Sequence, residues 1–177
     1  VILIFLLLLV KILYQPETET ERHTVRSLGS GWYQIRDGEK ITLELPCQVL
    51  TDADGKAVLY NDTLSAKDEG KIVSTRGIQD HLKVYMGDRL LYHYSDSGFL
   101  KNRPMKGKLW ADICLPDETG EEPLCFIFEG KENSLLYVEA PILGSFSSVA
   151  RHHLQASIFL ILMVLGMLGM GIVAVIV

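Results

Sequence analysis

The stretch His81–Tyr94, HLKVYMGDRLLYHY, decides the fold of this chain. Apolar residues occupy every second position over residues 82–86, with Lys83 and Tyr85 between them. This alternation is typical of a strand that buries one of its faces. Gly87-Asp88 then supplies a residue pair that suits a two-residue hairpin turn. The stretch therefore predicts two antiparallel strands joined by a tight turn.

The sequence on both sides of this hairpin also has the pattern of strands and turns. Short segments rich in β-branched and aromatic residues are separated by turn signals such as Asp52–Gly55. Further strands are predicted from Trp32 and over residues 41–45, 57–64, 71–75, 108–115, 124–128 and 135–142. We expect segments 108–115 and 124–128 to form a second hairpin across 117–122. Eight or so strands without helical periodicity between them predict a mainly β fold, an antiparallel β-sandwich of jelly-roll type.

Both ends of the 177-residue chain are strongly apolar. Residues 1–14 hold 13 apolar residues, and residues 156–177 hold 18 and no charge. A helix of the second length is about 33 Å long, enough to cross a bilayer core of about 30 Å. The sequence thus predicts two transmembrane helices, at 1–14 and within a juxtamembrane and transmembrane segment at 145–177. Residues 15–31 are then a linker, and residues 32–144 are the sandwich domain.

The first apolar segment is interpreted as an uncleaved signal anchor. A cleaved signal peptide would need a site of small residues after the apolar run, and Tyr14–Glu19 offers none. The sequence begins with Val1 and ends inside an apolar run at Val177. We therefore expect it to be a piece of a longer protein, with both membrane segments truncated.

The charges lie almost entirely in the central part of the chain. Lys11 is the only charged residue before Glu17, and none follows Arg151. The central part therefore carries 16 basic and 22 acidic residues, a net charge of −6. An acidic domain without a basic stripe argues against nucleic acid and against docking on an anionic membrane. An acidic domain directly after an N-terminal anchor is the usual layout of an exported domain, so we place it outside the cytoplasm.

Four stretches in this order carry a family resemblance: Trp32-Tyr33, Ile41–Pro46, His81–Tyr92 and Lys108–Trp110. They resemble the exported sensor region of membrane-bound bacterial signalling proteins, mostly diguanylate cyclases with a GGDEF output domain and some histidine kinases. The Leu-Pro strand end and the Val-Tyr-x-Gly-x-x-Leu hairpin are also similar to galactose-binding-like jelly rolls. The resemblance covers about residues 32–177. It implies the input domain of a receptor, and it names no ligand.

These observations predict an extracytoplasmic input domain of a membrane-bound receptor. It would bind a small molecule or a partner and pass the signal through the second transmembrane helix. Any output enzyme would lie beyond Val177. The alternative is a membrane-anchored accessory module that binds carbohydrate or envelope components and does not signal. Gly166 and Gly169 could leave one face of the second transmembrane helix without bulky side chains, where the same helix of a second copy could pack in a homodimer. The simpler explanation is that glycine is common in membrane helices.

Four side chains are candidates for ligand binding. Tyr85 alternates away from the apolar face of its strand, and Tyr60 and Trp110 lie in other predicted strands. Packing within the sheet is the simpler explanation for such aromatic residues. Arg76 follows a strand and precedes a glycine, in a position where it could meet a polar or anionic ligand.

The sequence offers little support for metal, cofactor or catalytic chemistry. Asp52–Gly55 is followed by Lys56 and apolar residues rather than by the further oxygen ligands of a calcium loop, so we interpret it as a β-turn. None of the five histidines has zinc-like spacing to another ligand. We interpret His152 and His153, with Arg151, as markers of the membrane headgroup boundary. No nucleophile or phosphate-loop motif occurs, so we expect no enzyme, metal site or cofactor in this chain.

The three cysteines leave one thiol unpaired within the chain. If Asp117 faces Glu122 in the expected second hairpin, Cys114 lies directly opposite Cys125. Cross-strand Cβ atoms are about 4.5–5.5 Å apart, longer than the disulfide value near 3.8 Å. A bond would form only if the strands draw together. Because cysteine also serves as a small buried apolar residue, we predict three reduced thiols.

Overall fold

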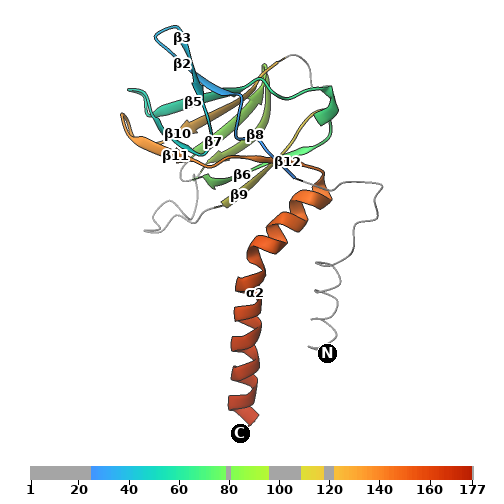
Figure 1. The fold of residues 1–177 in the computed structure, drawn as a ribbon. Coiled ribbons are helices and arrows are strands. Elements are labelled where there is room, and N and C mark those ends of the chain that lie inside the picture. The colour runs from blue at the N-terminus through green and yellow to red at the C-terminus, as the bar shows by residue number, and fades with distance from the viewer. Residues whose placement is uncertain (1–24, 79–80, 96–108, 118–121, 177) are drawn as a thin grey trace.

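The computed structural model of the chain describes residues 25–78, 81–95, 109–117 and 122–176, and its central domain consists almost entirely of strands (Figure 1). The predicted membrane segment 1–14 and residues 15–24 of the predicted linker lie outside the described residues. The elements are β1 (Arg26–Ser27), β2 (Trp32–Arg36), β3 (Glu39–Leu43), β4 (Cys47–Leu50), β5 (Lys56–Asn61), the short 3-10 helix η1 (Ala66–Asp68), β6 (Ile72–Ile78), β7 (His81–Met86), β8 (Arg89–Ser95), β9 (Leu109–Cys114), β10 (Leu124–Glu129), β11 (Leu135–Val138), β12 (Ile142–Gly144) and the helix α2 (Phe146–Ile176).

The strands form two main sheets and a two-stranded ribbon. The larger sheet has the order β3-β2-β5-β10-β7-β8, the smaller has the order β1-β12-β6-β9, and β11 pairs with β4. Every pairing among the described strands is antiparallel. The predicted mainly β, antiparallel, sandwich-like architecture is therefore confirmed.

The core lies between the six-stranded and four-stranded sheets. Alternate residues of β10, β5 and β7 point inward and are buried, as Phe126, Leu59 and Val84 illustrate. The fully buried indole of Trp32 packs edge-on against Phe126, with the ring centroids 5.0 Å apart. Its N–H donates to the carbonyl of Leu28 at 2.6 Å, which satisfies the one polar atom of the side chain.

The predicted hairpin over residues 81–94 is confirmed. β7 and β8 pair in antiparallel register from His81–Ser95 to Met86–Arg89. Gly87 in the turn has φ of 54°, a left-handed conformation that glycine adopts at little cost. The register shifts between Val84 and Tyr85, a bulge that the alternation pattern did not reveal.

The predicted hairpin of segments 108–115 and 124–128 is wrong. β9 pairs with β6 in the four-stranded sheet, whereas β10 lies between β5 and β7 in the six-stranded sheet. The connection between them crosses from one sheet to the other. Alternation shows which face of a strand is buried, but it does not identify the neighbouring strand, so proximity in sequence was misleading here.

Four further strands, β1, β4, β11 and β12, differ from the prediction. β1 lies inside the predicted linker, and β4 follows Pro46. The predicted strand 135–142 is divided into β11 and β12, which belong to different sheets. Pro141 lies at this division, and proline lacks the N–H that a continuing ladder would require.

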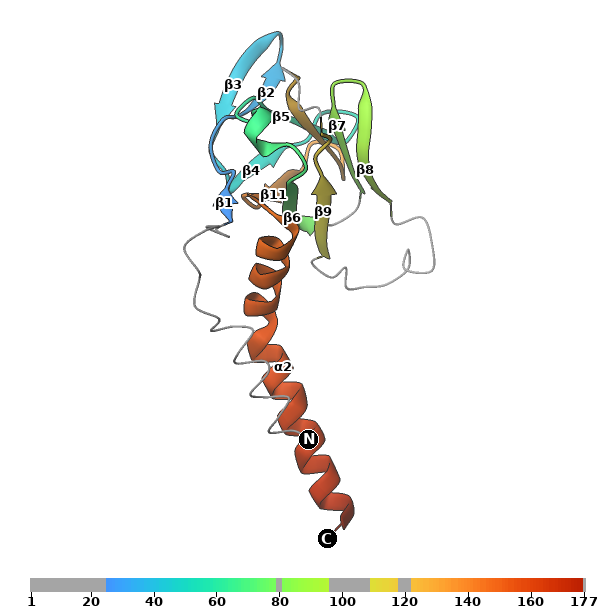
Figure 2. The ribbon, with the colours of Figure 1, turned by 90° about the vertical axis from the view of Figure 1, so that its right-hand side faces the viewer.

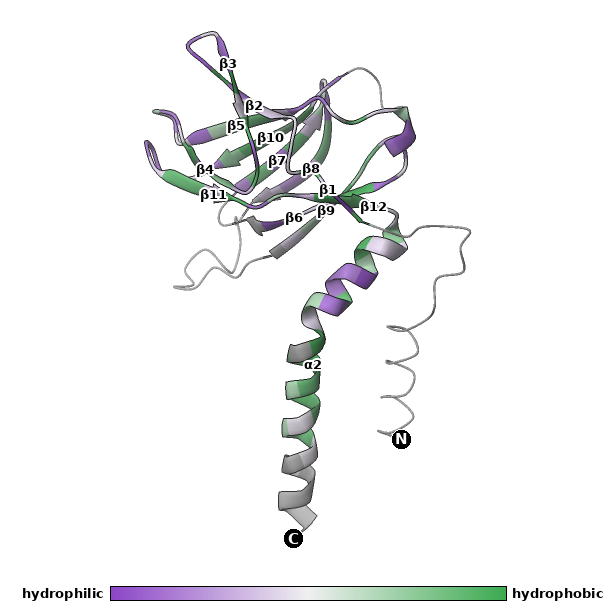
Figure 3. Cartoon of the chain, viewed as in Figure 1, coloured by the Kyte–Doolittle hydropathy of each residue, from purple (hydrophilic) through white to green (hydrophobic). Residues whose placement is uncertain are grey.

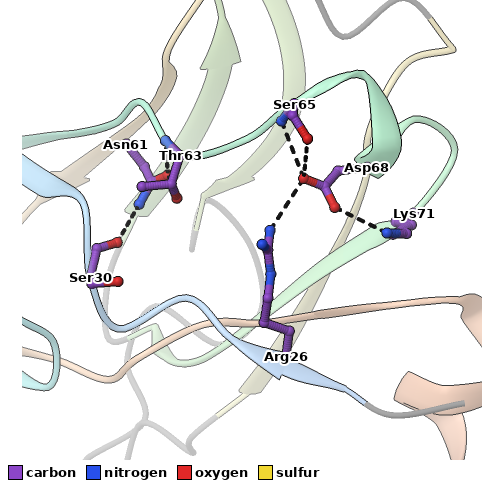
Figure 4. A network of polar contacts seen from close by, with 7 residues as sticks. All are labelled: Arg26, Ser30, Asn61, Thr63, Ser65, Asp68 and Lys71. Atoms are coloured by element: carbon purple, nitrogen blue, oxygen red, sulfur yellow. Dashed lines mark hydrogen bonds and ion pairs between the residues drawn. The ribbon is translucent and has the colours of Figure 1, made fainter. Parts of the chain in front are cut away.

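A buried carboxylate joins β1, η1 and the start of β6 (Figure 4). The Asp68 side chain is 5% exposed, and it accepts hydrogen bonds from Arg26 at 3.2 Å and from Lys71 at 3.0 Å. The N–H and hydroxyl of Ser65 also donate to it, which forms a capping box on η1. Burial alone would raise the pKa of Asp68, but the hydrogen bonds from Lys71 and Ser65 and the charges of Arg26 and Lys71 hold it below its usual value.

A second buried polar side chain holds the loop that follows β5. Asn61 is fully buried at the end of this strand. Its amide N–H donates to the Ser30 carbonyl at 3.0 Å, and its amide oxygen accepts from the N–H and hydroxyl of Thr63 (Figure 4). Because each of these groups has a partner, burial of the amide is tolerated.

The helix α2 begins almost immediately after the last strand and leaves the sandwich on one side (Figure 2). Ser145 caps it, since the hydroxyl oxygen accepts from the Ser148 N–H at 3.3 Å. Figure 3 shows hydrophilic residues in the turns near the sandwich and hydrophobic residues further along the helix. Within the described residues no single straight helix qualifies as a membrane span. Phe146–Ile158 and Leu160–Gly169, bent by 51° at the residue between them, qualify together by length and composition.

We predict that Asp68→Asn lowers the free energy of unfolding by about 2 kcal/mol, because hydrogen bonds to a buried charged group are lost. Denaturant unfolding of the full chain, followed by tryptophan fluorescence, measures this loss. The stabilisation from Asp68 should be fully present above pH 3.8, its ordinary pKa, and should disappear as the pH falls through the lower folded-state pKa.

The matched control for this variant is Asp62→Asn. Asp62 makes an exposed ion pair with Lys40 at 3.0 Å, and its loss should cost about 0.5 kcal/mol or less. If the two variants lose equal stability, the buried network does not hold this end of the sandwich.

Candidate functional site

The structure separates the four candidate ligand-binding residues into two pairs on different sheets. Arg76 and Trp110 are direct partners on β6 and β9 of the four-stranded sheet. Tyr60 and Tyr85 lie on β5 and β7 of the six-stranded sheet. The two pairs therefore form two separate sites, each with its own surroundings.

The first site is the junction between the four-stranded sheet and α2. The indole of Trp110 stacks on the imidazole of His153, with ring centroids 4.1 Å apart and an interplanar angle of 29°. The guanidinium carbon of Arg76 lies 5.2 Å from the centroid of the same indole, within cation–π range. His152 approaches Trp110 edge-on at 6.2 Å. Trp110 is thus the contact that connects β6, β9 and α2.

His153 makes the polar contacts of this junction. Its Nε2 lies 3.0 Å from the hydroxyl of Ser74, a buried residue of β6. The same nitrogen lies 3.8 Å from a carboxylate oxygen of Asp112 on β9. The His153 side chain is 20% exposed, whereas that of Asp112 is 43% exposed. The imidazole is therefore largely enclosed, and its nearest counter-charge is partly solvated.

This arrangement lowers the pKa of His153. Burial disfavours the imidazolium and is the largest cause, and the neighbouring His152 acts in the same direction. Asp112 opposes them by stabilising the positive charge. The structure thus favours a neutral ring stacked on Trp110.

The chain passes from β12 into α2 through a closely packed glycine. A Cβ atom on Gly144 would come within 3.2 Å of Val25 and 3.4 Å of the Ser148 side chain. Ser148 and Val149, in the first turn of α2, are buried. The first turns of the helix are therefore held against the sandwich by packing as well as by the His153 contacts.

The second site is a row of aromatic side chains on the outer face of the six-stranded sheet. Tyr60 and Tyr85 are the direct neighbours of Cys125 on either side of β10. Tyr33 pairs with Tyr60 on the next strand, and their rings stack 5.3 Å apart. The Lys40 ammonium lies 3.8 Å from the centroid of the Tyr33 ring. The row thus crosses four strands, and its members are half-buried.

The centre of this row is uncharged at neutral pH. Burial raises the pKa of Cys125 to about 11, and burial also raises the pKa of Tyr60. On this face Lys83 pairs with Glu129 at 2.8 Å, and Lys40, beside Tyr33, pairs with Asp62 at 3.0 Å. The row therefore offers aromatic faces with charged groups at its border, and the protonated thiol is not a nucleophile.

Sequence reasoning missed the role of the two adjacent histidines. We interpreted His152 and His153 as markers of a headgroup boundary, but His153 contacts β6 and β9. The available signal was their position just after the last strand, on a helix that starts without a linker. The Tyr33 contribution to the outer row could have been found from the same alternation that singled out Tyr85.

Within the described ranges, no group of three or more His, Cys, Asp or Glu side chains is arranged to hold a metal ion.

Comparison of the chain with protein-family models, with curated proteins and with solved structures found no match. Function is therefore inferred from the residues and their contacts.

The cysteines do not adopt the pairing that the second hairpin would have allowed. Cys114 lies opposite Ile72 in the four-stranded sheet, and Cys125 lies opposite Tyr60 and Tyr85 in the other. All three cysteines are free, with Cys114 exposed and the other two partly buried.

Timed alkylation should distinguish the three thiols. At pH 8 we expect iodoacetamide to modify Cys114 first and Cys125 last, because the thiolate is the reactive form and burial raises the pKa of Cys125 to about 11. Peptide mass spectrometry measures each rate, and the denatured chain, in which all three should react alike, is the control. A peptide that links Cys114 to Cys125 would contradict the observed strand order.

Proposed function

We propose that this chain is the extracytoplasmic input domain of a membrane-bound signalling receptor. Its sandwich binds a small molecule or a partner, and α2 carries the signal through the membrane. The observation that supports this most directly is the junction at Trp110 and His153. It fixes the first turns of a long apolar helix to one sheet of the domain.

The composition and exposure of α2 support a membrane location for residues 156–176. Leu160 and Met167 are 66% and 62% exposed, and no described part of the chain covers them. Such a length of exposed apolar helix is costly in water and is favourable in a bilayer. In this proposal residues 1–14 form the signal anchor, the sandwich is a jelly roll of galactose-binding-like type, and the domain lies outside the cytoplasm.

The short connection between sandwich and helix gives the proposal a mechanism. A ligand can signal only if it binds two states of the receptor with different affinity. A movement of β6 or β9 would be transmitted to α2 through the contact of Trp110 with His153. The helix begins two residues after β12, so no flexible linker separates it from the sandwich. In a homodimer, Gly166 and Gly169 would let two such helices approach closely. Output enzymes such as a diguanylate cyclase or kinase would lie beyond Val177, and we expect no catalysis from this chain.

The two pairs of candidate residues take different roles in this proposal. Tyr60 and Tyr85 belong to the face that receives the ligand, because their rings lie on the outer side of the sheet beside Cys125. Arg76 and Trp110 belong to the junction that couples the domain to α2.

The second candidate function is a membrane-anchored accessory module that binds carbohydrate or envelope components without signalling. The row of Tyr33, Tyr60 and Tyr85 favours it, since flat aromatic faces can stack on the C–H faces of sugar rings. The sequence after Val177 distinguishes the two functions. A cytoplasmic enzyme or dimerisation helix supports the receptor, and a short basic tail supports the accessory module.

Membrane extraction tests the location of the chain. Alkaline carbonate should leave the protein in the membrane pellet, because two apolar helices are embedded in lipid. A reporter fused near residue 90 should be active outside the cytoplasm. Release into the supernatant would contradict the anchors, and a cytoplasmic reporter signal would contradict the orientation.

A thermal-shift screen over sugars, amino acids and peptides tests ligand binding. A ligand at a hundred times its dissociation constant should stabilise the domain by about 2.7 kcal/mol. The double substitution Tyr60→Ser and Tyr85→Ser should abolish this gain. Tyr137→Ser is the control, since Tyr137 is exposed on β11, away from the row. If the double variant keeps the full gain, the outer row is not the binding face.

A further inference from the structure

The contact between α2 and the sandwich has a titratable ring at its centre. We propose that this domain also responds to acid, and that protonation of His153 releases the first turns of α2 from the four-stranded sheet. This inference rests on the proposed receptor function and adds the proton as a second input, separate from the ligand face at Tyr60 and Tyr85. It follows from the position of the imidazole between Trp110, Ser74 and Asp112.

The described ionisable groups near His153 lie on β9, on β6 and on α2 itself. Asp112 faces it from β9 at 3.8 Å, and Arg76 on β6 reaches the Trp110 ring on which His153 stacks. Arg151 and His152 precede it on α2. The three residues of β12, Ile142–Gly144, carry no ionisable side chain. A proton added to His153 therefore meets one carboxylate, the two arginines and the imidazole of His152.

Two opposing effects act on the imidazolium. Enclosure of the ring and repulsion from His152 disfavour the charge, whereas Asp112 favours it. Because Asp112 is 43% exposed and lies beyond hydrogen-bond distance, solvent weakens its attraction. Desolvation therefore wins, and the neutral ring is the form that fits the junction.

The Ser74 contact positions the ring and does not itself respond to pH. A hydroxyl can donate to a neutral Nε2 or accept from a protonated one, so the 3.0 Å contact is compatible with both forms. Acid sensitivity therefore comes from burial and charge, and Ser74 sets where the ring lies.

The direction of the pH effect follows from the difference between the pKa of His153 when α2 is docked and when it is released. The pKa of His153 lies below 6.5 when α2 is docked, and it returns toward that value when the ring is released to solvent. The released state therefore binds more protons, so acid favours it. Docking is strongest above about pH 6.5 and weakens as the pH falls toward the docked-state pKa. Each unit of difference between the two pKa values changes the docking constant about tenfold.

Hydrogen–deuterium exchange of the full chain in phosphatidylcholine nanodiscs tests the proposal. After correction for intrinsic exchange rates, amides of residues 146–154 should exchange severalfold faster at pH 5 than at pH 8. Peptides from β10 in the core should not change. In His153→Gln, which keeps a polar side chain but does not titrate, the difference between the two pH values should vanish.

Two charge variants should change the size of the acid-induced increase in exchange. They would leave it unchanged if His153 had only a structural role. Asp112→Asn removes the group that stabilises the imidazolium, so the acid-induced increase in exchange should become larger than in the wild type. His152→Gln removes a repulsive neighbour, so the increase should become smaller. Both effects are measured relative to the same variant at pH 8. His93→Gln, an exposed histidine on β8, is the control and should behave like the wild type.

The outcomes separate this proposal from the proposed receptor function. Equal exchange at pH 5 and pH 8 in the wild type, or an unchanged acid response in His153→Gln, would overturn the acid input. Trp110→Ala should release residues 146–154 at pH 8, because it removes the stacking partner. If Trp110→Ala releases the helix and acid does not, Trp110 holds α2 to the sheet, and the receptor responds to a ligand other than the proton. If neither releases it, the junction does not hold α2 and the receptor mechanism also fails.

Discussion

The structure depends on the alternating burial of the central strand β10. Leu124, Phe126 and Phe128 point into the space between the two main sheets, and burying each such side chain contributes about 1.5–3 kcal/mol. The strand pairs with β5 on one side and β7 on the other over its whole length, so its alternation fixes which residues of those strands face inward. A shift of one residue would expose all three apolar side chains of β10, and this cost holds the register of the sheet.

The same constraint creates the outer row of aromatic residues. Since Phe126 faces the core, its neighbour Cys125 faces outward, and the register places Tyr60 and Tyr85 directly beside it. The proposed ligand face is therefore a consequence of core packing. Its chemistry is set by the residue types on the outward positions, which the core leaves free to vary.

The junction with α2 has a different physical origin. It is assembled at one end of the sandwich, where a buried polar group of the sheet meets the polar first turns of α2. Ser74 is buried yet finds a partner in His153, and the ring of His153 stacks on Trp110. Because the helix begins two residues after β12, its first turns stay close to this surface. A short connection and a small set of polar contacts thus give the domain a defined link to the segment that we place in the membrane.

Local sequence determined those features that depend on neighbouring residues. Alternation over residues 82–86 and the Gly87 turn identified the β7–β8 hairpin. Tertiary structure alone decided which strands pair across the domain. Segments 108–115 and 124–128 looked like a hairpin, but their strands entered different sheets because long-range packing, rather than the loop between them, selects the partner of a strand. For the same reason, the meeting of Trp110 with His153, 43 positions later in the chain, could not be read from either residue's surroundings in the sequence.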